Sequence, residues 1–189
     1  HEIRTPLNAI VGFSGILASA DEEQDRQEYV SIIENNNALL LQLISDILDL
    51  SKIEAGTLEF HYSNIDLNRT MNELTDSLSP RIDKNKVQFS FHPAKESCFI
   101  YTEKNRLSQI LINLITNAIK FTSEGSIRFG YELRGREIYF YVSDTGCGIP
   151  EDKLQGIFGR FVKLNNFKQG TGLGLSICQT LVEHMKGNI

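Results

Sequence analysis

The chain has 189 residues, of which 41% are hydrophobic and 23% are charged, and its net charge is −5. These values are typical of a soluble globular protein of one or two domains. The sequence contains neither the run of roughly 18 apolar residues that a membrane-spanning helix needs nor a signal peptide, although a longer parent protein could still carry a membrane anchor.

The distribution of charge and the cysteine content further restrict the kinds of protein that this chain can be. Residues 1–60 contain 3 Lys and Arg against 11 Asp and Glu, whereas the rest of the chain is mildly basic. This asymmetry predicts two units with different partners, of which the second binds an anion. No stretch of the sequence is typical of nucleic-acid binding. Cys98, Cys147 and Cys178 form no CxxC pair, which argues against a disulfide framework or a zinc site and fits a reducing compartment.

Residues 1–19 are predicted to form a helix with one apolar face. At about 100° per residue, the side chains that gather on this face are Ile3, Leu7, Ile10, Val11, Phe13 and Leu17. His1, Thr5 and Asn8 fall on the opposite side, so His1 is expected to face outward.

A second helix is predicted from the acidic turn at Asp21–Asp25 to about Glu54, with Gly56 ending it. A heptad seam follows this helix, and its members are Tyr29, Ile33, Asn36, Leu40, Leu43, Ile47 and Leu50. We expect the two helices to form a four-helix bundle with a second copy of the chain. The alternative is that they pack on the rest of the same chain.

From Thr57 onward the sequence alternates between strand and helix patterns. Helices are expected at residues 64–78, 103–121 and 173–186, and strands at residues 86–91, 97–101, 126–133 and 137–143. Arg134-Gly135-Arg136 is typical of a hairpin turn, and Gly187 is expected to end the last helix. This order predicts an α+β sandwich in which helices cover one face of one sheet.

The helix at 103–121 carries the first motif with candidate chemistry. It is apolar around most of its circumference, yet Gln109, Asn113, Asn117 and Lys120 form one polar stripe. Amide oxygens can bind Mg²⁺ and a lysine can bind phosphate. The periodicity by itself favours a simpler interpretation, a stripe that faces solvent.

The second motif is Asp144-Thr145-Gly146-Cys147-Gly148-Ile149-Pro150, which follows a strand. Period-two alternation predicts that Asp144 faces inward, where its carboxylate needs a donor such as an adenine amino group. Gly146 and Gly148 would let the backbone turn tightly against a flat ligand. A DxGxG pattern is also common in ordinary turns.

The third motif is Gly170-Thr171-Gly172-Leu173-Gly174-Leu175, at the start of the last helix. Its backbone N–H groups can bind phosphates. Its spacing is neither that of the Walker loop nor that of the dinucleotide fingerprint.

Together with two further segments, these motifs resemble those of the sensor histidine kinases. His1-Glu2-Ile3-Arg4-Thr5-Pro6-Leu7-Asn8 resembles the H box and Ile157-Phe158-Gly159-Arg160-Phe161 the phenylalanine box. Residues 113–122, 144–150 and 170–176 resemble the N box and the two glycine boxes. The resemblance implies a dimerisation and phosphoacceptor hairpin over residues 1–57. It implies, over residues 58–189, an ATP-binding domain of the GHKL type, the fold shared with Hsp90-like chaperones, DNA gyrase and MutL.

The H box of the family implies roles for four residues. His1 would be the phosphoacceptor, and Glu2 its acid/base partner. Arg4 would support the phosphoryl group, and Thr5 would orient water in a phosphatase reaction. Pro6 is expected to bend the helix by removing one backbone hydrogen bond.

The other boxes imply a site for Mg-ATP. Asn117 would bind Mg²⁺ with Asn113 beside it, Lys120 would contact phosphate, and Asp144 would read adenine. The residues of the two glycine boxes assigned to the nucleotide are Gly146, Gly148, Gly170, Thr171, Gly172 and Gly174.

Residues 155–169 would form a mobile lid over the nucleotide. Either Arg160 or Lys163 in this lid could bind the γ-phosphate, and the sequence does not choose between them. His61, His92 and His184 match no motif and are expected to be structural or exposed.

The implied reaction is autophosphorylation of His1 from Mg-ATP, then transfer to an aspartate of a response regulator, with phosphatase activity beside it. The family continues past Ile189 into further strands, so the chain is expected to be a fragment, the cytoplasmic portion of a membrane-anchored receptor. Two alternatives remain: a catalytically silent module for dimerisation and regulator docking, and a GHKL ATPase without kinase activity. The intact nucleotide positions argue against the first, and the H box on a heptad-bearing hairpin argues against the second.

Overall fold

The computed structural model describes residues 2–20, 22–164 and 170–189, which divide between two compact units. The first unit comprises residues 1–58 and 159–177, and the second comprises residues 59–158 and 178–189. None of the described helices combines the length and the hydropathy needed to cross a lipid bilayer. The elements in chain order are α1 (Arg4–Leu17), α2 (Glu23–Glu54), β1 (Ser63–Asp66), α3 (Leu67–Leu78), η1 (Ser79–Arg81), β2 (Val87–His92), β3 (Phe99–Thr102), α4 (Lys104–Phe121), β4 (Gly125–Arg134), β5 (Glu137–Asp144), η2 (Glu151–Gly156) and α5 (Gly174–His184).

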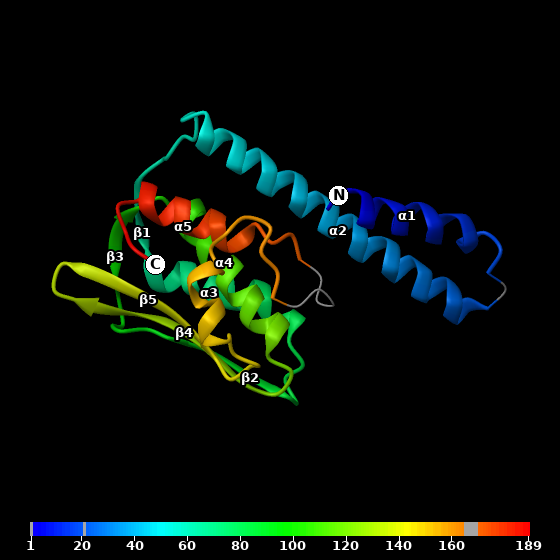
Figure 1. Cartoon of the computed structure of the whole chain (residues 1–189). Coiled ribbons are helices and arrows are strands. Elements are labelled where there is room, and N and C mark those ends of the chain that lie inside the picture. Colours follow the sequence, from blue (N-terminus) through cyan, green and yellow to red (C-terminus); the bar gives the residue numbers. More distant parts are fainter. Residues whose placement is uncertain (1, 21, 165–169) are drawn as a thin grey trace. The chain divides into compact units, whose positions relative to one another are not determined.

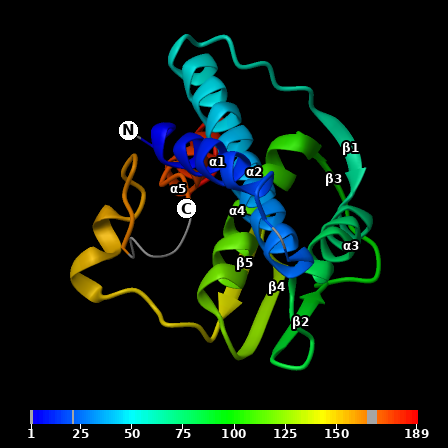
Figure 2. The same cartoon turned by 90° about the vertical axis from the view of Figure 1, so that its right-hand side faces the viewer.

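The first unit is built on a helical hairpin in which α1 lies along the N-terminal half of α2 (Figures 1 and 2). The rings of Phe13 and Tyr29 pack between the two helices, with their centroids 5.6 Å apart. Arg26 stabilises the connection, since its Nε donates to the carbonyl oxygen of Ala20 at 2.9 Å. Both predicted helices are confirmed, although α1 begins only at Arg4; Asp21 of the predicted acidic turn lies outside the described residues.

The predicted heptad seam of α2 is shielded from water: Asn36 and Leu43 are buried, and the remaining members are half-buried. Asn36 satisfies its amide locally, because Nδ2 donates to the carbonyl oxygen of Ile32 at 2.8 Å.

Gly56 ends α2 as predicted. Its φ of 63° places it in the left-handed region, which glycine adopts without steric cost. The N–H groups of Gly56 and Thr57 then bond back to the carbonyl oxygens of Ile53 and Lys52, at 3.0 and 2.9 Å. This pair of bonds is a Schellman motif.

The second unit contains two sheets rather than the single predicted sheet. One has the order β2-β4-β5, with β2 parallel and β5 antiparallel to β4, and the other is the antiparallel pair β1-β3. The predicted helix at 64–78 is therefore wrong at its start, because Asn64 and Ile65 pair with Tyr101 and Ile100. Asp66 ends this strand and caps α3 by accepting the backbone N–H of Arg69 at 3.1 Å.

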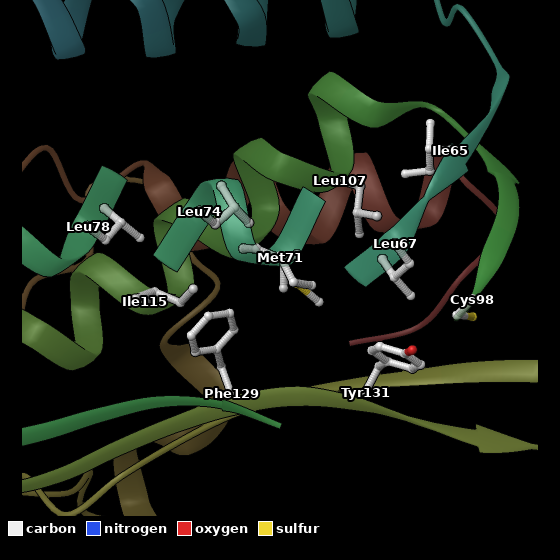
Figure 3. Close-up of a cluster of buried hydrophobic side chains, with 11 residues drawn as sticks. Ile65, Leu67, Met71, Leu74, Leu78, Cys98, Leu107, Ile115, Phe129 and Tyr131 are labelled. Atoms are coloured by element: carbon white, nitrogen blue, oxygen red, sulfur yellow. The ribbon is translucent and has the colours of Figure 1, made fainter. Parts of the chain in front are cut away.

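The core of the second unit lies between helices α3 and α4 and one face of the β2-β4-β5 sheet, as predicted (Figure 3). Phe129 and Tyr131 rise from β4 towards Met71 of α3 and Ile115 of α4, and all four side chains are fully buried. The Tyr131 hydroxyl donates to Asn68 Oδ1 at 2.8 Å. Burial raises the pKa of Tyr131 to about 12. This packing fixes α4, which carries the polar stripe.

Two predicted glycine positions have different outcomes. Gly135, with a φ of 64°, forms the turn between β4 and β5 as predicted. At the end of α5, however, the left-handed residue is Lys186, with a φ of 61°, and Gly187 follows it and donates to the carbonyl oxygen of Val182 at 2.8 Å. The helix itself ends at His184, two residues before the predicted end at Lys186.

Candidate functional site

The polar stripe of α4 is half-buried, and it does not have the fully exposed position of a solvent-facing stripe. Asn113, Asn117 and Lys120 all lie between the core-facing and the solvent-facing sides of the helix. Gln109 accepts a hydrogen bond from Arg106 at 2.9 Å. The amide of Asn117 makes no hydrogen bond with any side chain or backbone group that the structure describes, so its oxygen is open to a ligand.

Asp144 ends β5 on the core-facing side of the strand, directly opposite buried Ile127, but its side chain is exposed. Its strand neighbours Phe140 and Val142 pack on the core, whereas Asp144 is exposed because it is the last residue of the strand. Asp144 Oδ1 accepts the backbone N–H of Gly146 at 2.8 Å and faces the hydroxyl of Thr122 at 3.5 Å. The predicted face is therefore confirmed by the strand register, although the carboxylate is exposed rather than buried. The carboxylate has the protein donors that fix its orientation.

The turn after β5 packs closely against the C-terminal end of α4. A Cβ added to Gly146 would lie 2.5 Å from the carbonyl oxygen of Phe121, so only glycine fits there. The N–H of Cys147 donates to the same carbonyl oxygen at 3.3 Å. Gly148 has a φ of 68°, which again favours glycine. The first glycine box is thus packed directly on, and hydrogen-bonded to, the end of the N-box helix.

Thr122 is a site residue that sequence reasoning left without a role. It ends α4, its side chain is buried, and its hydroxyl is the side-chain donor facing Asp144. The available signal was its position directly after the N-box helix, next to the residues already assigned.

The second glycine box belongs to the first unit, and it is also closely packed. Gly172 has a φ of 70°, and an added Cβ would lie 2.8 Å from the backbone of Phe161. The hydroxyl of Thr171 accepts the N–H of Leu173 at 3.1 Å and donates to Asp46 Oδ2 of α2 at 2.8 Å. Helix α5 begins at Gly174, within this box.

The two lid cations are both paired with carboxylates of the hairpin. Arg160 Nη1 lies 2.5 Å from Glu54 Oε1, and Lys163 Nζ pairs with Glu2 Oε2. Residues 165–169 of the predicted lid lie outside the described residues.

The H box lies at the start of α1. His1, the predicted phosphoacceptor, lies outside the described residues, while Glu2 is half-buried and Arg4 and Thr5 are exposed. Pro6 falls in the first turn of α1, where a backbone N–H has no intrahelical partner in any case. It therefore removes no hydrogen bond from the described part of α1.

Asp46 is a buried carboxylate that sequence reasoning missed. Burial raises its pKa above the ordinary value, while hydrogen bonds from Thr171 and Gln42 oppose this rise and the charge of Asp49 adds to it. Its sequence signal was weak, since Asp46 directly precedes Ile47 of the heptad seam and resembles any charge beside a seam.

Comparison with known proteins accounts for both units. Residues 1–56 match the family model described as the His Kinase A (phospho-acceptor) domain, and residues 102–189 match that of the histidine kinase-, DNA gyrase B- and HSP90-like ATPases. A phosphoacceptor hairpin followed by an ATPase domain of this type defines an ATP-dependent phosphotransferase.

Individual relatives agree with this class. The autoinducer 2 sensor kinase/phosphatase LuxQ of Vibrio vulnificus is 37% identical over 200 residues, which cover 100% of this chain and 23% of LuxQ. The histidine kinase AdeS of Acinetobacter baumannii has a TM-score of 0.76 at 25% identity, over 100% of this chain and 89% of the AdeS chain. The catalytic domain of the histidine kinase ThkA is 32% identical, with a TM-score of 0.60, over 66% of this chain and 82% of that domain.

The chain belongs to the sensor histidine kinase family and is the catalytic core of a protein-histidine kinase. It spans about a quarter of the length of LuxQ, 23%. The predicted fold, a helical hairpin followed by a GHKL-type ATPase domain that uses ATP, is confirmed.

Proposed function

We propose that this core transfers the γ-phosphoryl group of Mg-ATP to the imidazole of His1 and then to an aspartate of a response regulator. The observation that carries the proposal is the open amide of Asn117 on a half-buried face of α4. Asn117 lies one helical turn before Phe121, whose carbonyl oxygen anchors the turn that follows Asp144. A magnesium ligand and an adenine acceptor are thereby attached to one rigid helix.

The residues present fit magnesium and adenine. Mg²⁺ is commonly bound by one or two protein oxygens together with substrate phosphates, so the Asn117 amide, with Asn113 beside it, suffices on the protein side. Bound there, Mg²⁺ would neutralise charge on the departing diphosphate. Asp144 uses Oδ1 for Gly146 and Thr122, which leaves Oδ2 to accept the adenine amino group.

In the proposed reaction, an imidazole nitrogen of His1 bonds to the γ-phosphorus while the bond from that phosphorus to the bridging oxygen of ADP breaks. Glu2 accepts the imidazole proton, and Arg4 supports the phosphoryl group. Lys120, with Arg160 or Lys163, meets the phosphates. Thr5 orients the attacking water when the core acts as a phosphatase, a separate hydrolytic reaction that releases inorganic phosphate. Such a transfer needs positioning and charge neutralisation more than covalent chemistry from the protein.

We further propose that the chain acts as a homodimer. Exposed apolar side chains form a stripe on α2, where Leu41, Ile44 and Leu48 follow one another at steps of three and four and are 60%, 43% and 55% exposed. On α1, Leu7 and Val11 are exposed as well. A second hairpin packed on these side chains would complete a four-helix bundle.

A response regulator is the proposed acceptor. ThkA, with a TM-score of 0.76 at 28% identity over 99% of this chain and 53% of that chain, has been crystallised in complex with the response regulator TrrA. We place the core on the cytoplasmic side of a membrane-anchored parent protein; its use of ATP and the three free thiols fit a reducing compartment.

The proposal is tested by following phosphoenzyme and free phosphate together after addition of Mg-ATP. A kinase accumulates phosphoenzyme up to one group per active subunit and passes it to a receiver domain. Steady release of phosphate without phosphoenzyme would instead identify an ATPase, and absence of nucleotide binding would identify a docking module.

A further inference from the structure

The hydroxyl proton of Thr171, in the second glycine box, is used in a contact within the protein. This proton is donated to Asp46 Oδ2, and the hydroxyl oxygen accepts the N–H of Leu173. Both Thr171 and Asp46 are buried, at 7% and 2% exposure, and Gln42 donates to the second oxygen of Asp46 at 2.7 Å. The hydroxyl of Thr171 therefore has no proton left to donate to a phosphate in this arrangement.

The lid cations show the same pattern within the same unit. Arg160 pairs with Glu54 and Lys163 pairs with Glu2, so that both candidate γ-phosphate contacts meet a carboxylate of the hairpin. A carboxylate offers the anionic oxygens that such cations seek in a phosphate.

We propose that Glu2, Asp46 and Glu54, here called the carboxylate latch, compete with the phosphates of ATP for the phosphate-binding groups of residues 159–164 and 170–177. The latch holds these two segments on the hairpin in a state of low nucleotide affinity, and ATP must displace it. The inference rests on the proposed function, because that function takes Arg160 or Lys163 as a phosphate contact and the second glycine box, with Thr171, as part of the nucleotide site.

The three contacts are unequal. The side chains of Arg160 and Glu54 are each about half exposed, at 52% and 55%, and an ion pair so exposed to water contributes little by itself. The Asp46–Thr171 bond is buried and joins a carboxylate to a hydroxyl, so it is the main anchor. The Lys163–Glu2 pair also involves the transfer chemistry, because Glu2 is the residue proposed to accept the imidazole proton of His1.

The test uses the whole chain with Asp46→Asn, Glu54→Gln and the double variant, which keep the shape of each side chain and remove its charge. Glu34→Gln is the matched control, because Glu34 is an exposed carboxylate of α2 without a hydrogen bond or ion pair to the part of the chain that the structure describes. Hydrogen exchange of residues 159–164 and 170–177 is measured without nucleotide. Affinity is then measured with Mg²⁺ and a non-hydrolysable ATP analogue.

The latch predicts faster exchange in the two segments and, for the double variant, an analogue affinity raised about tenfold, since the binding-competent fraction increases. The control should match the wild type in both. If hydrogen exchange in the double variant equals that of the wild type, the latch contacts do not hold the segments on the hairpin. If exchange is faster but affinity for the ATP analogue is unchanged or weaker, the carboxylates do not compete with ATP. If the wild type binds the analogue normally, either result leaves the proposed function standing. If exchange rises but no form of the chain binds the analogue, the proposed function itself fails and the competition fails with it.

Discussion

The hydroxyl of Thr171 donates a 2.8 Å hydrogen bond to the carboxylate of Asp46, although the two residues are 125 positions apart in the sequence. One belongs to the glycine-rich segment assigned to ATP, and the other to the long helix of the phosphoacceptor hairpin. The bond has consequences for stability as well as for regulation, because it satisfies a carboxylate that is almost removed from water.

Asp46 should make the stability of the chain depend on pH. Its pKa in the folded state lies above the ordinary value of 3.8, so over that interval the folded chain binds more protons than the unfolded chain. The contribution of Asp46 to the free energy of unfolding therefore falls as the pH rises through the interval. Urea unfolding between about pH 4 and about pH 7 should show Asp46→Asn gaining stability relative to the wild type as the pH rises. A constant difference would contradict this account.

Asn117→Ala should weaken nucleotide binding only where magnesium takes part. Removing the amide oxygen removes the proposed metal ligand, so affinity for Mg-ATP should fall about tenfold or more, and binding of ATP in EDTA should change little. Asn105→Ala is the control, since Asn105 is an exposed residue of the same helix. Titration calorimetry checks both, and an equal loss with and without magnesium would remove Asn117 from the metal site.

Gly146→Ala should damage the adenine end of the site. The new methyl group would collide with the carbonyl oxygen of Phe121, and the turn would have to move. We expect a loss of about 1–3 kcal/mol in stability together with loss of ATP binding. Gly156→Ala should be nearly neutral, because nothing lies within 4 Å of its added Cβ. Thermal unfolding with and without nucleotide distinguishes the two variants.

Cys147 should report on nucleotide binding through its reactivity. It is exposed within the first glycine box, whereas Cys98 and Cys178 are buried, so a maleimide should react with one thiol in the folded chain. ATP should slow this reaction and GTP should not, because Asp144 is proposed to recognise the adenine amino group. Mass spectrometry of the modified chain gives the site, and equal rates with and without ATP would mean that the nucleotide binds elsewhere.

Leu41→Lys should prevent dimer formation without unfolding the hairpin. Leu41 is 60% exposed in the single chain, so a lysine there is tolerated in a monomer but would be buried in the proposed bundle. Sedimentation should show a monomer for Leu41→Lys and a dimer for both the wild type and the control Glu34→Lys. If Leu41→Lys remains a dimer, the second copy does not pack on this stripe.

Local periodicity predicted most of the helices well, since a buried stripe recurs every three or four residues in α2 and α4. It failed for β1, where Ile65 is the single apolar residue in a strand of four and the pairing partner lies on distant β3. For Asp144 it gave the correct side of the strand but not the exposure, because alternation does not say where the covering layer ends.

The residues of the candidate site likewise fall into those that could be predicted from the sequence and those that could not. The residues of the boxes could be assigned because each box is a short continuous motif. Thr122, which stands at the edge of one box, and Asp46, which lies outside them all, owe their roles to contacts with residues 22 and 125 positions away. A single sequence carries no signal for such contacts.

The central claim is that the chain phosphorylates His1, and the direct measurement is the position and chemistry of the phosphoryl group after incubation with Mg²⁺ and γ-labelled ATP. We predict a label that is stable in base and lost in acid, that maps to the first peptide, and that disappears in His1→Gln while ATP binding persists. A label that survives in His1→Gln, or one that is stable in acid, would contradict the assignment of His1 as the phosphoacceptor.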